Sequence, residues 1–223
     1  MKTEIMDLED EYMTIGQIVI LIVGALVAFG VCQRVLDKMR LTDRQALLIA
    51  LFIFVGGFLP EISIGNVKIN IGGAVVPLVL CAYLFIKADS GYERMRAFTA
   101  SLVTAASVIA LGRFFPDEPD RMPFDVNYLY GLAAGIIACM AGRSRRAAFI
   151  AGAMGVLLAD IAEGALVNAS DVSQSLVLGG AGAMDVIVIS ALTAVLLKEL
   201  AGEFMERCVR GAKPAKKEGA GRK

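Results

Sequence analysis

Three carboxylates lie inside apolar segments or at their ends, where a charged side chain needs a structural or functional reason. Asp160 and Glu163 occur in LLADIAEG, and Asp185 follows the small residues of GGAGAMD. A carboxylate at the centre of a bilayer costs about 2.5–3.5 kcal/mol on insertion scales, so such residues mark candidate binding or proton-transfer sites. Asp160 and Glu163 are three residues apart and would share one face of a helix. Their combined charge in a low-dielectric pocket would attract a small cation.

Two other hypotheses explain the same residues. If Asp160 and Asp185 share a proton, they are candidate catalytic residues, one as base and one as acid, in an aspartyl hydrolase. Alternatively, the acids are structural. Asp160 would then form an ion pair with Arg113, Asp185 would stabilise a helix N-terminus, and Glu163 would be solvated at the outer interface.

Small residues accompany these acids at two places. Gly-Gly-Ala occurs at 72–74, where it includes Gly72 and Gly73, and again at 179–181, where it includes Gly180. Such residues let membrane helices approach closely, or they start a discontinuous helix whose N–H groups face a cavity. Asn70 precedes the first copy and is a candidate helix cap. We therefore expect a polar pocket lined by these glycines, Asn70, Asp160 and Asp185.

The residue types exclude several classes of chemistry. The chain contains no histidine, which excludes Ser-His-Asp and Cys-His catalysis and any His-ligated metal site. We expect no metal and no cofactor. The four cysteines fall within helices, near their inner ends or in the tail, so no structural disulfide is expected.

The apolar segments that must position these residues predict an all-α, polytopic membrane protein. The chain has 223 residues, of which 57% are hydrophobic, and the mean hydropathy is +0.68. About 20 apolar residues span a bilayer core. Seven segments approach that length: 15–33, 45–60, 71–87, 97–115, 126–142, 147–167 and 183–200.

The distribution of Lys and Arg predicts the orientation. With the N-terminus outside, all but four of the 22 Lys and Arg lie on the inner side, as the positive-inside rule requires. The domain organisation expected is an acidic outer segment over 1–14, a membrane domain over 15–200 and a basic cytoplasmic tail over 201–223. Because the tail directly follows an apolar segment, it indicates topology and not nucleic-acid binding.

Two local patterns add detail. EISIGNVKINI alternates apolar and polar residues around Gly65-Asn66, which predicts a small β-hairpin at the outer side. An ungapped shift aligns 24–86 with 131–193 and superposes the two Gly-Gly-Ala segments. This predicts a parallel 3+1+3 repeat, with the alternative that Gly- and Ala-rich segments match by composition.

NIGGAVVPLVLCAYLF, LLADIAEG and LVLGGAGAMDVIVISALTAVLL together resemble the prokaryotic membrane family catalogued as domain of unknown function 1614. The resemblance covers about residues 46–197, although Glu163 has no counterpart in the family pattern. It implies a polytopic membrane protein and supplies no activity. A weaker similarity links the two Asp-bearing helices to intramembrane aspartyl proteases. The glycines here lie two residues too far from Asp185, and Ala159 stands where those proteases have Tyr.

The function expected from the residues is binding or transport of a cation or small cationic solute. A structural or assembly role and an intramembrane aspartyl hydrolase remain the alternatives, so enzymatic activity is left open. The expected partners are the lipid bilayer, the cation or solute, and a second copy in a homo-oligomer. The expected location is the cytoplasmic (inner) membrane of a prokaryote.

Overall fold

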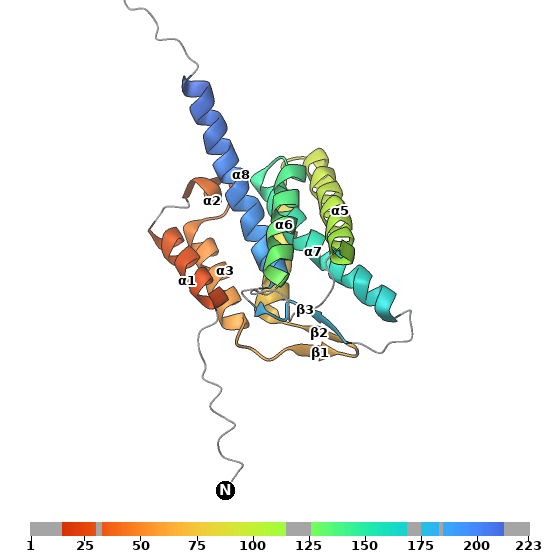
Figure 1. The fold of residues 1–223 in the computed structure, drawn as a ribbon. Helices are drawn as coiled ribbons and strands as arrows, with labels where there is room; N and C mark the ends of the chain where they lie inside the picture. The colour runs from red at the N-terminus through yellow and green to blue at the C-terminus, as the bar shows by residue number, and fades with distance from the viewer. Residues whose placement is uncertain (1–14, 30–32, 115–125, 169–174, 183–184, 212–223) are drawn as a thin grey trace, which may run out of the picture.

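The computed structural model describes residues 15–29, 33–114, 126–168, 175–182 and 185–211. It is mostly helical with one small sheet, which confirms the coarse fold class (Figure 1). The elements in chain order are α1 (Ile15–Ala28), α2 (Gln33–Met39), α3 (Asp43–Gly56), β1 (Ile62–Ile64), β2 (Val67–Ile69), the π-helix η1 (Ile71–Val75), α4 (Val76–Ile86), α5 (Gly91–Phe114), α6 (Val126–Ala141), α7 (Arg145–Asn168), β3 (Leu176–Leu178) and α8 (Val186–Gly211).

Each predicted apolar segment contains a helix, but two details were wrong. The short helix α2 lies between the first two predicted segments, where no helix was predicted. Helix α8 continues to Gly211, past the expected helix end at 200, so the first half of the expected tail is helical. Among the described residues, two helices are long and apolar enough to cross a bilayer, over Gly91–Arg113 and Arg145–Val167. The apolar helices over Ile71–Ile86 and Asn127–Ala141 are shorter, so seven spans are not confirmed.

The predicted β-hairpin is present, and a third strand joins it. Gly65 adopts a φ of 61° in the turn, which glycine tolerates without a steric penalty. Strand β2 pairs antiparallel with β1 and parallel with β3, with Lys68 opposite Val177. No strand was predicted for the β3 segment. Because β3 has only three residues, its apolar pattern was too short to indicate a strand.

Small residues fill the helix interfaces of the core. Ala148, Ala151 and Ala194 are fully buried where α7 and α8 meet, and a Cβ on Gly135 would lie 2.6 Å from Thr193. Alanine and glycine at these positions let the helix backbones approach closely, which is typical of membrane helix packing. The Ser190 hydroxyl donates to the Gly152 carbonyl at 2.9 Å and ties α8 to α7.

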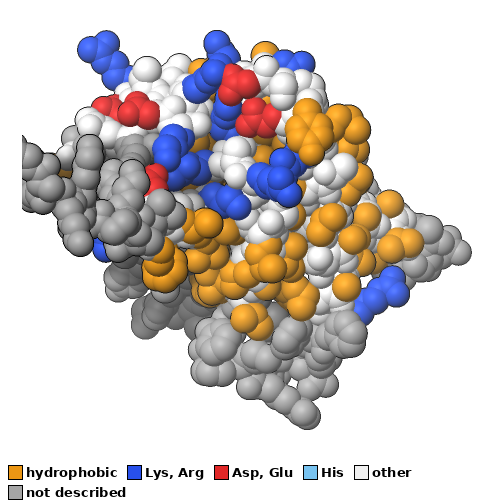
Figure 2. Space-filling view, turned by 90° about the horizontal axis from the view of Figure 1, so that it is seen from above, with side chains coloured by type: hydrophobic (Ala, Val, Ile, Leu, Met, Phe, Trp, Pro, Cys, Tyr) orange, Lys and Arg blue, Asp and Glu red, His pale blue; other side chains and the backbone are white. Residues whose placement is uncertain are grey.

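The molecule has two different ends. The sheet lies at one end, and the α4–α5 and α6–α7 connections lie at the other (Figure 1). A view onto the second end shows Lys and Arg side chains gathered there, with fewer Asp and Glu among them (Figure 2). We call the first the sheet end and the second the basic end.

The order of elements in the two predicted repeats is similar. The first contains α1, α3, β2 and α4, and the second contains α6, α7, β3 and α8. Helix α2 and strand β1 lack counterparts among the described residues of the second. In both, a short strand leads into Gly-Gly and then a helix. The repeat stays a prediction.

Candidate functional site

Asn70 organises the start of the helix that follows β2. Its side-chain oxygen accepts a hydrogen bond from the Gly73 N–H at 3.0 Å, so it caps η1. Its own N–H donates to the Leu178 carbonyl at 2.9 Å, which links it to β3. Only 4% of Asn70 is exposed. The residue is therefore a buried junction between the sheet and the helices, as the cap hypothesis predicts.

The two Gly-Gly segments pack directly against each other. A Cβ on Gly73 would lie 2.2 Å from the Gly179 carbonyl oxygen and 2.8 Å from that of Gly182. A Cβ on Gly72 would lie 2.5 Å from the Ile53 carbonyl oxygen at the end of α3. Gly72 and Gly73 thus serve close backbone packing. Backbone atoms of neighbouring segments occupy the space next to both glycines, so that space is not open to a ligand.

Gly180 lies at the edge of this junction. It is exposed, and a Cβ there would lie 2.7 Å from Val177 of β3 and 3.6 Å from a Glu61 carboxylate oxygen. Its neighbours Gly179 and Gly182 adopt φ values of 72° and 57°. Glycine accepts such values without strain, so the chain can turn from β3 into α8 within a few residues.

Asp185 stands at the entry to α8. Its Oδ1 accepts a hydrogen bond from the Ile187 N–H at 2.9 Å, and its own N–H donates to the Gly182 carbonyl at 3.2 Å. A carboxylate in this position satisfies a free N–H and interacts favourably with the helix dipole. The capping role predicted as one alternative for Asp185 is therefore present.

Asp160 lies on α7, with electrostatic interactions from both Asp185 and Glu163. The three carboxylates from α7 and the start of α8 are thus brought together near the sheet end. Asp160 is half-buried, whereas Glu163 is exposed, with its Oε1 3.4 Å from where a Cβ on Gly112 of α5 would lie. Within the described part of the chain, the Asp160 side chain forms no hydrogen bond and no ion pair. The two charged groups that act on it, Asp185 and Glu163, have the same sign.

Arg113 does not supply the expected counter-charge. It is exposed near the end of α5, and no ion pair between described residues joins it to Asp160. The structural hypothesis for Asp160 required that pair. No group of three or more Cys, Asp or Glu within the described ranges is arranged to hold a metal ion.

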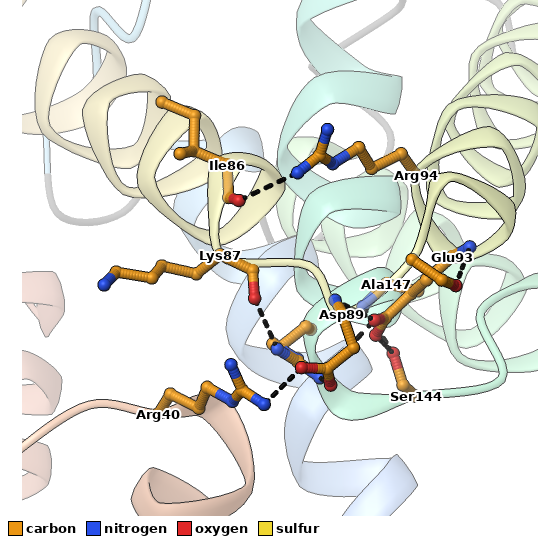
Figure 3. A network of polar contacts seen from close by, with 10 residues as sticks. Arg40, Ile86, Lys87, Asp89, Glu93, Arg94, Ser144 and Ala147 are labelled. Atoms are coloured by element: carbon orange, nitrogen blue, oxygen red, sulfur yellow. Dashed lines mark hydrogen bonds and ion pairs between the residues drawn. The ribbon is translucent and has the colours of Figure 1, made fainter.

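The basic end contains a polar network that includes Arg40, Asp89 and Glu93 (Figure 3). Arg146, 8% exposed, forms ion pairs with Asp89 and, at 3.4 Å, with Glu93. It also donates to the Lys87 carbonyl at 2.9 Å. Arg40 reaches Asp89 from beyond the end of α2. The network therefore joins α2, the α4–α5 connection and α7.

Other contacts extend this network. The Ser144 hydroxyl donates to Glu93 at 3.0 Å and accepts from the Ala147 N–H at 3.1 Å, so it also caps α7. Arg145 pairs with Glu199 of α8, and both side chains are largely buried. One nitrogen of Arg146 and one oxygen of Glu199 are buried and have no hydrogen-bond partner among the residues that the structure describes.

The comparison with known families agrees with the sequence patterns. A family described as a protein of unknown function, DUF1614, matches residues 30–197. The chain belongs to the DUF1614 family. The family resemblance expected from the sequence is thus confirmed. No curated protein and no solved structure shows significant similarity to the chain.

The DUF1614 match contains more candidate functional residues than the sequence analysis identified. It includes both Gly-Gly segments and the three carboxylates, and it also includes Arg40, Asp89, Glu93 and Arg146. From the sequence, Arg40 and Arg146 counted only toward the distribution of Lys and Arg, and Asp89 and Glu93 were not singled out. One pattern in the sequence could have indicated the network. Asp89 and Glu93 are four residues apart beside a short loop, so an arginine at the start of a neighbouring helix could contact both.

The contact between Asp89 and Arg146 predicts an acid-sensitive stability. The pKa of Asp89 is lowered, mainly by the hydrogen bond from Arg146. Burial opposes this shift, and the positive charges of Arg146 and Arg40 add to it. Because the folded-state pKa is depressed, the stabilisation is complete above the unfolded value of about 3.9 and is lost as pH falls through the folded value. In DUF1614 protein purified in detergent, we expect Asp89→Asn to lower the unfolding midpoint at pH 7. The difference from wild type should shrink below pH ~4, and a constant difference would contradict the assignment.

Proposed function

We propose that the chain is a multi-pass protein of a prokaryotic cytoplasmic membrane. Large apolar side chains on several helices face outward, between 47% and 64% exposed: Leu51, Phe52, Val79, Leu102, Ile136 and Leu196. Soluble monomers rarely expose apolar surface on this scale. Of the apolar stretch in α5, only 28% is buried, whereas a core helix of a soluble protein would be mostly buried. A lipid bilayer is the environment in which such an apolar surface is stable.

Seven crossings are part of this proposal, with residues 15–200 as the membrane domain. The stretch from Ile71 to Ile86 has 16 residues and would be about 24 Å long, shorter than the ~30 Å core. Local thinning of the bilayer accommodates such a mismatch at modest cost. The basic end would face the cytoplasm, and the sheet end would face outward.

A topology experiment tests this orientation. A reporter active only outside the cytoplasm should work when fused after Glu118 or Ser170 and fail when fused after Arg145 or Lys217. The reason is that Lys and Arg concentrate at the basic end and in the tail. The opposite pattern of activity would place the carboxylates on the cytoplasmic side.

The function that the geometry supports best is binding of a small cation or cationic solute at Asp160, with transport as its extension. The observation that carries the proposal is the environment of Asp160. It is a half-buried carboxylate that forms no hydrogen bond or ion pair with any described residue and faces Asp185 and Glu163. Like charges in a low-dielectric environment repel strongly, and a bound cation relieves that repulsion. The carboxylates are not arranged as a three-ligand metal site, which favours a monovalent or organic cation.

A cation screen tests the proposal on the full chain in detergent. Sodium, potassium, methylammonium and guanidinium would be compared at constant ionic strength, with choline as the replacement ion. A ligand at 100 times its Kd stabilises by about 2.7 kcal/mol, which corresponds to a rise of roughly 5–10 °C. Glu61→Gln is the matched control for Asp160→Asn. Glu61 is an acid at the sheet end outside the group of Asp160, Glu163 and Asp185, and its Oε2 lies 4.0 Å from Lys68 Nζ. The proposal expects Glu61→Gln to retain the shift, and a screen in which no cation raises the midpoint would contradict it.

A structural role is the second candidate, and specific contacts favour it for part of the site. Asn70 and Asp185 both cap helices, and the glycines pack against backbone. These contacts make the junction a scaffold that positions Asp160. In this proposal the capping residues are structural and Asp160 is the ligand-binding residue. The hydrolase hypothesis stays a prediction.

A further inference from the structure

A second candidate site is an apolar cavity of about 220 Å³ between α1–α3 and the helices α4, α7 and α8. It is neither sealed nor a flat surface groove, and every residue that lines it is apolar. Representative lining residues are Met39, Ala46, Ile53, Pro77, Phe149 and Leu192. Asp160, Glu163 and Asp185 are not among them, so this cavity is separate from the proposed cation site.

The residues that line the cavity extend along the helices. On α8 its lining runs from Val188 to Leu196, which corresponds to about 12 Å of helix. On α3 it runs from Ala46 to Ile53, about 10 Å. An apolar space that borders membrane helices over this length suits a segment of a hydrocarbon chain.

Water is a poor occupant of this space. A buried water needs two to four polar partners, and the lining supplies none. An apolar cavity of about 150 Å³ already binds benzene, so the larger cavity here has room for a segment of one hydrocarbon chain.

Cations lie where the cavity approaches the basic end. Met39 and Leu41 line the cavity on either side of Arg40, and Ala46 lines it two residues after Arg44. Lys38 and Arg44 are exposed, and neither forms an ion pair with another described residue. Arg40 is already paired with Asp89. Two acids, Asp37 and Asp43, share the segment, but four cations over residues 33–44 outnumber them.

We infer that the cavity holds one acyl chain of an anionic phospholipid, whose headgroup lies near Lys38 and Arg44. The membrane placement proposed above is a premise of this inference. The apolar lining selects the hydrocarbon chain, and the adjacent cations select a negative headgroup. Juxtamembrane cations attract anionic lipid in this way.

The chain contains no tryptophan, so a single introduced tryptophan can report on lipid contact. Phe149→Trp places the probe in the cavity lining, and Leu102→Trp places it on the exposed surface of α5. Both would be reconstituted in vesicles containing acyl-brominated phosphatidylglycerol or acyl-brominated phosphatidylcholine. We expect stronger quenching of the cavity probe by the brominated phosphatidylglycerol and equal quenching of the surface probe by the two lipids.

Two further variants separate the contribution of the cations from that of the apolar cavity. Each Lys or Arg near a charged surface favours anionic lipid about fivefold, so Lys38→Gln with Arg44→Gln should reduce the preference roughly tenfold or more. Arg207→Gln is the matched control, because Arg207 is 83% exposed on α8 and its one ion pair with a described residue is with Glu203. Ala46→Leu should fill part of the cavity and weaken quenching of the cavity probe by both lipids.

Each outcome decides between the proposals. Equal quenching of the cavity probe by both lipids would overturn the anionic preference. An unquenched cavity probe beside a quenched surface probe would overturn the lipid site and leave the membrane placement intact, whereas two unquenched probes would overturn both. If Phe149→Trp fails to fold, native mass spectrometry of the wild type in mild detergent replaces it. If the wild type retains phosphatidylglycerol and Ala46→Leu loses it, the site is supported. If the wild type retains no phosphatidylglycerol, the site is overturned.

Discussion

Gly73→Ala is expected to cause the largest loss of stability among the variants described. The added Cβ would lie 2.2 Å from the Gly179 carbonyl oxygen and 2.8 Å from that of Gly182, and both are backbone atoms that cannot rotate away. Overpacking usually costs 1–3 kcal/mol, and a backbone clash of this severity should cost about 3 kcal/mol or more. The unfolding midpoint of the detergent-solubilised protein, together with its yield as a monodisperse species, measures this loss.

Gly91→Ala is the matched control. Gly91 begins α5, and no neighbouring atom lies within 4 Å of the added Cβ. Alanine is the better helix former, so this change should be neutral or slightly stabilising. If both variants fold equally well, the two Gly-Gly segments cannot pack as closely as described.

Arg146→Gln should cause the second large loss of stability. Arg146 is buried between Asp89 and Glu93, and its removal leaves two carboxylates without their shared cation. Breaking a fully buried pair costs 3–5 kcal/mol, but Asp89 is half-exposed, so we expect about 2–3 kcal/mol. Arg146→Lys should fall between wild type and Arg146→Gln, because lysine restores the charge and cannot reproduce the forked hydrogen bonds.

The exposed Arg207 provides the comparison for this prediction. It forms one ion pair with Glu203 on the same helix, which is worth a few tenths of a kcal/mol. Arg207→Gln should therefore leave the unfolding midpoint nearly unchanged. Equal effects of Arg146→Gln and Arg207→Gln would mean that the network at the basic end does not hold α2, α5 and α7 together.

The sequence predicted the elements whose signal is local. The long apolar segments became helices, and Gly65-Asn66 marked the hairpin because a tight turn needs positive φ. Strand β3 and helix α2 were missed because three and seven residues are too few to establish a period. Strand β3 depends on pairing with β2, which is more than a hundred residues away in the chain.

The candidate site was predictable to a similar degree. Asn before Gly-Gly indicated a cap, and carboxylates on successive antiparallel helices were expected to meet near one end. The expected Arg113 partner was not found for Asp160, because helix positions alone do not determine which side chains meet. The network around Arg146 was missed because it joins three segments whose charges each looked like ordinary loop charges.

The most direct test of the account is the unfolding midpoint of wild type and Asp160→Asn, each without and with the cation that most stabilises the wild type. The Asp160 side chain forms no hydrogen bond or ion pair with a described residue, so an amide of the same shape removes no contact. It also relieves the repulsion from Asp185 and Glu163, so the ligand-free midpoint should be unchanged or slightly raised. The cation should then raise the midpoint of wild type and not that of Asp160→Asn. A large loss of stability without cation would show that Asp160 is structural, and an equal cation shift in both proteins would show that the cation binds elsewhere.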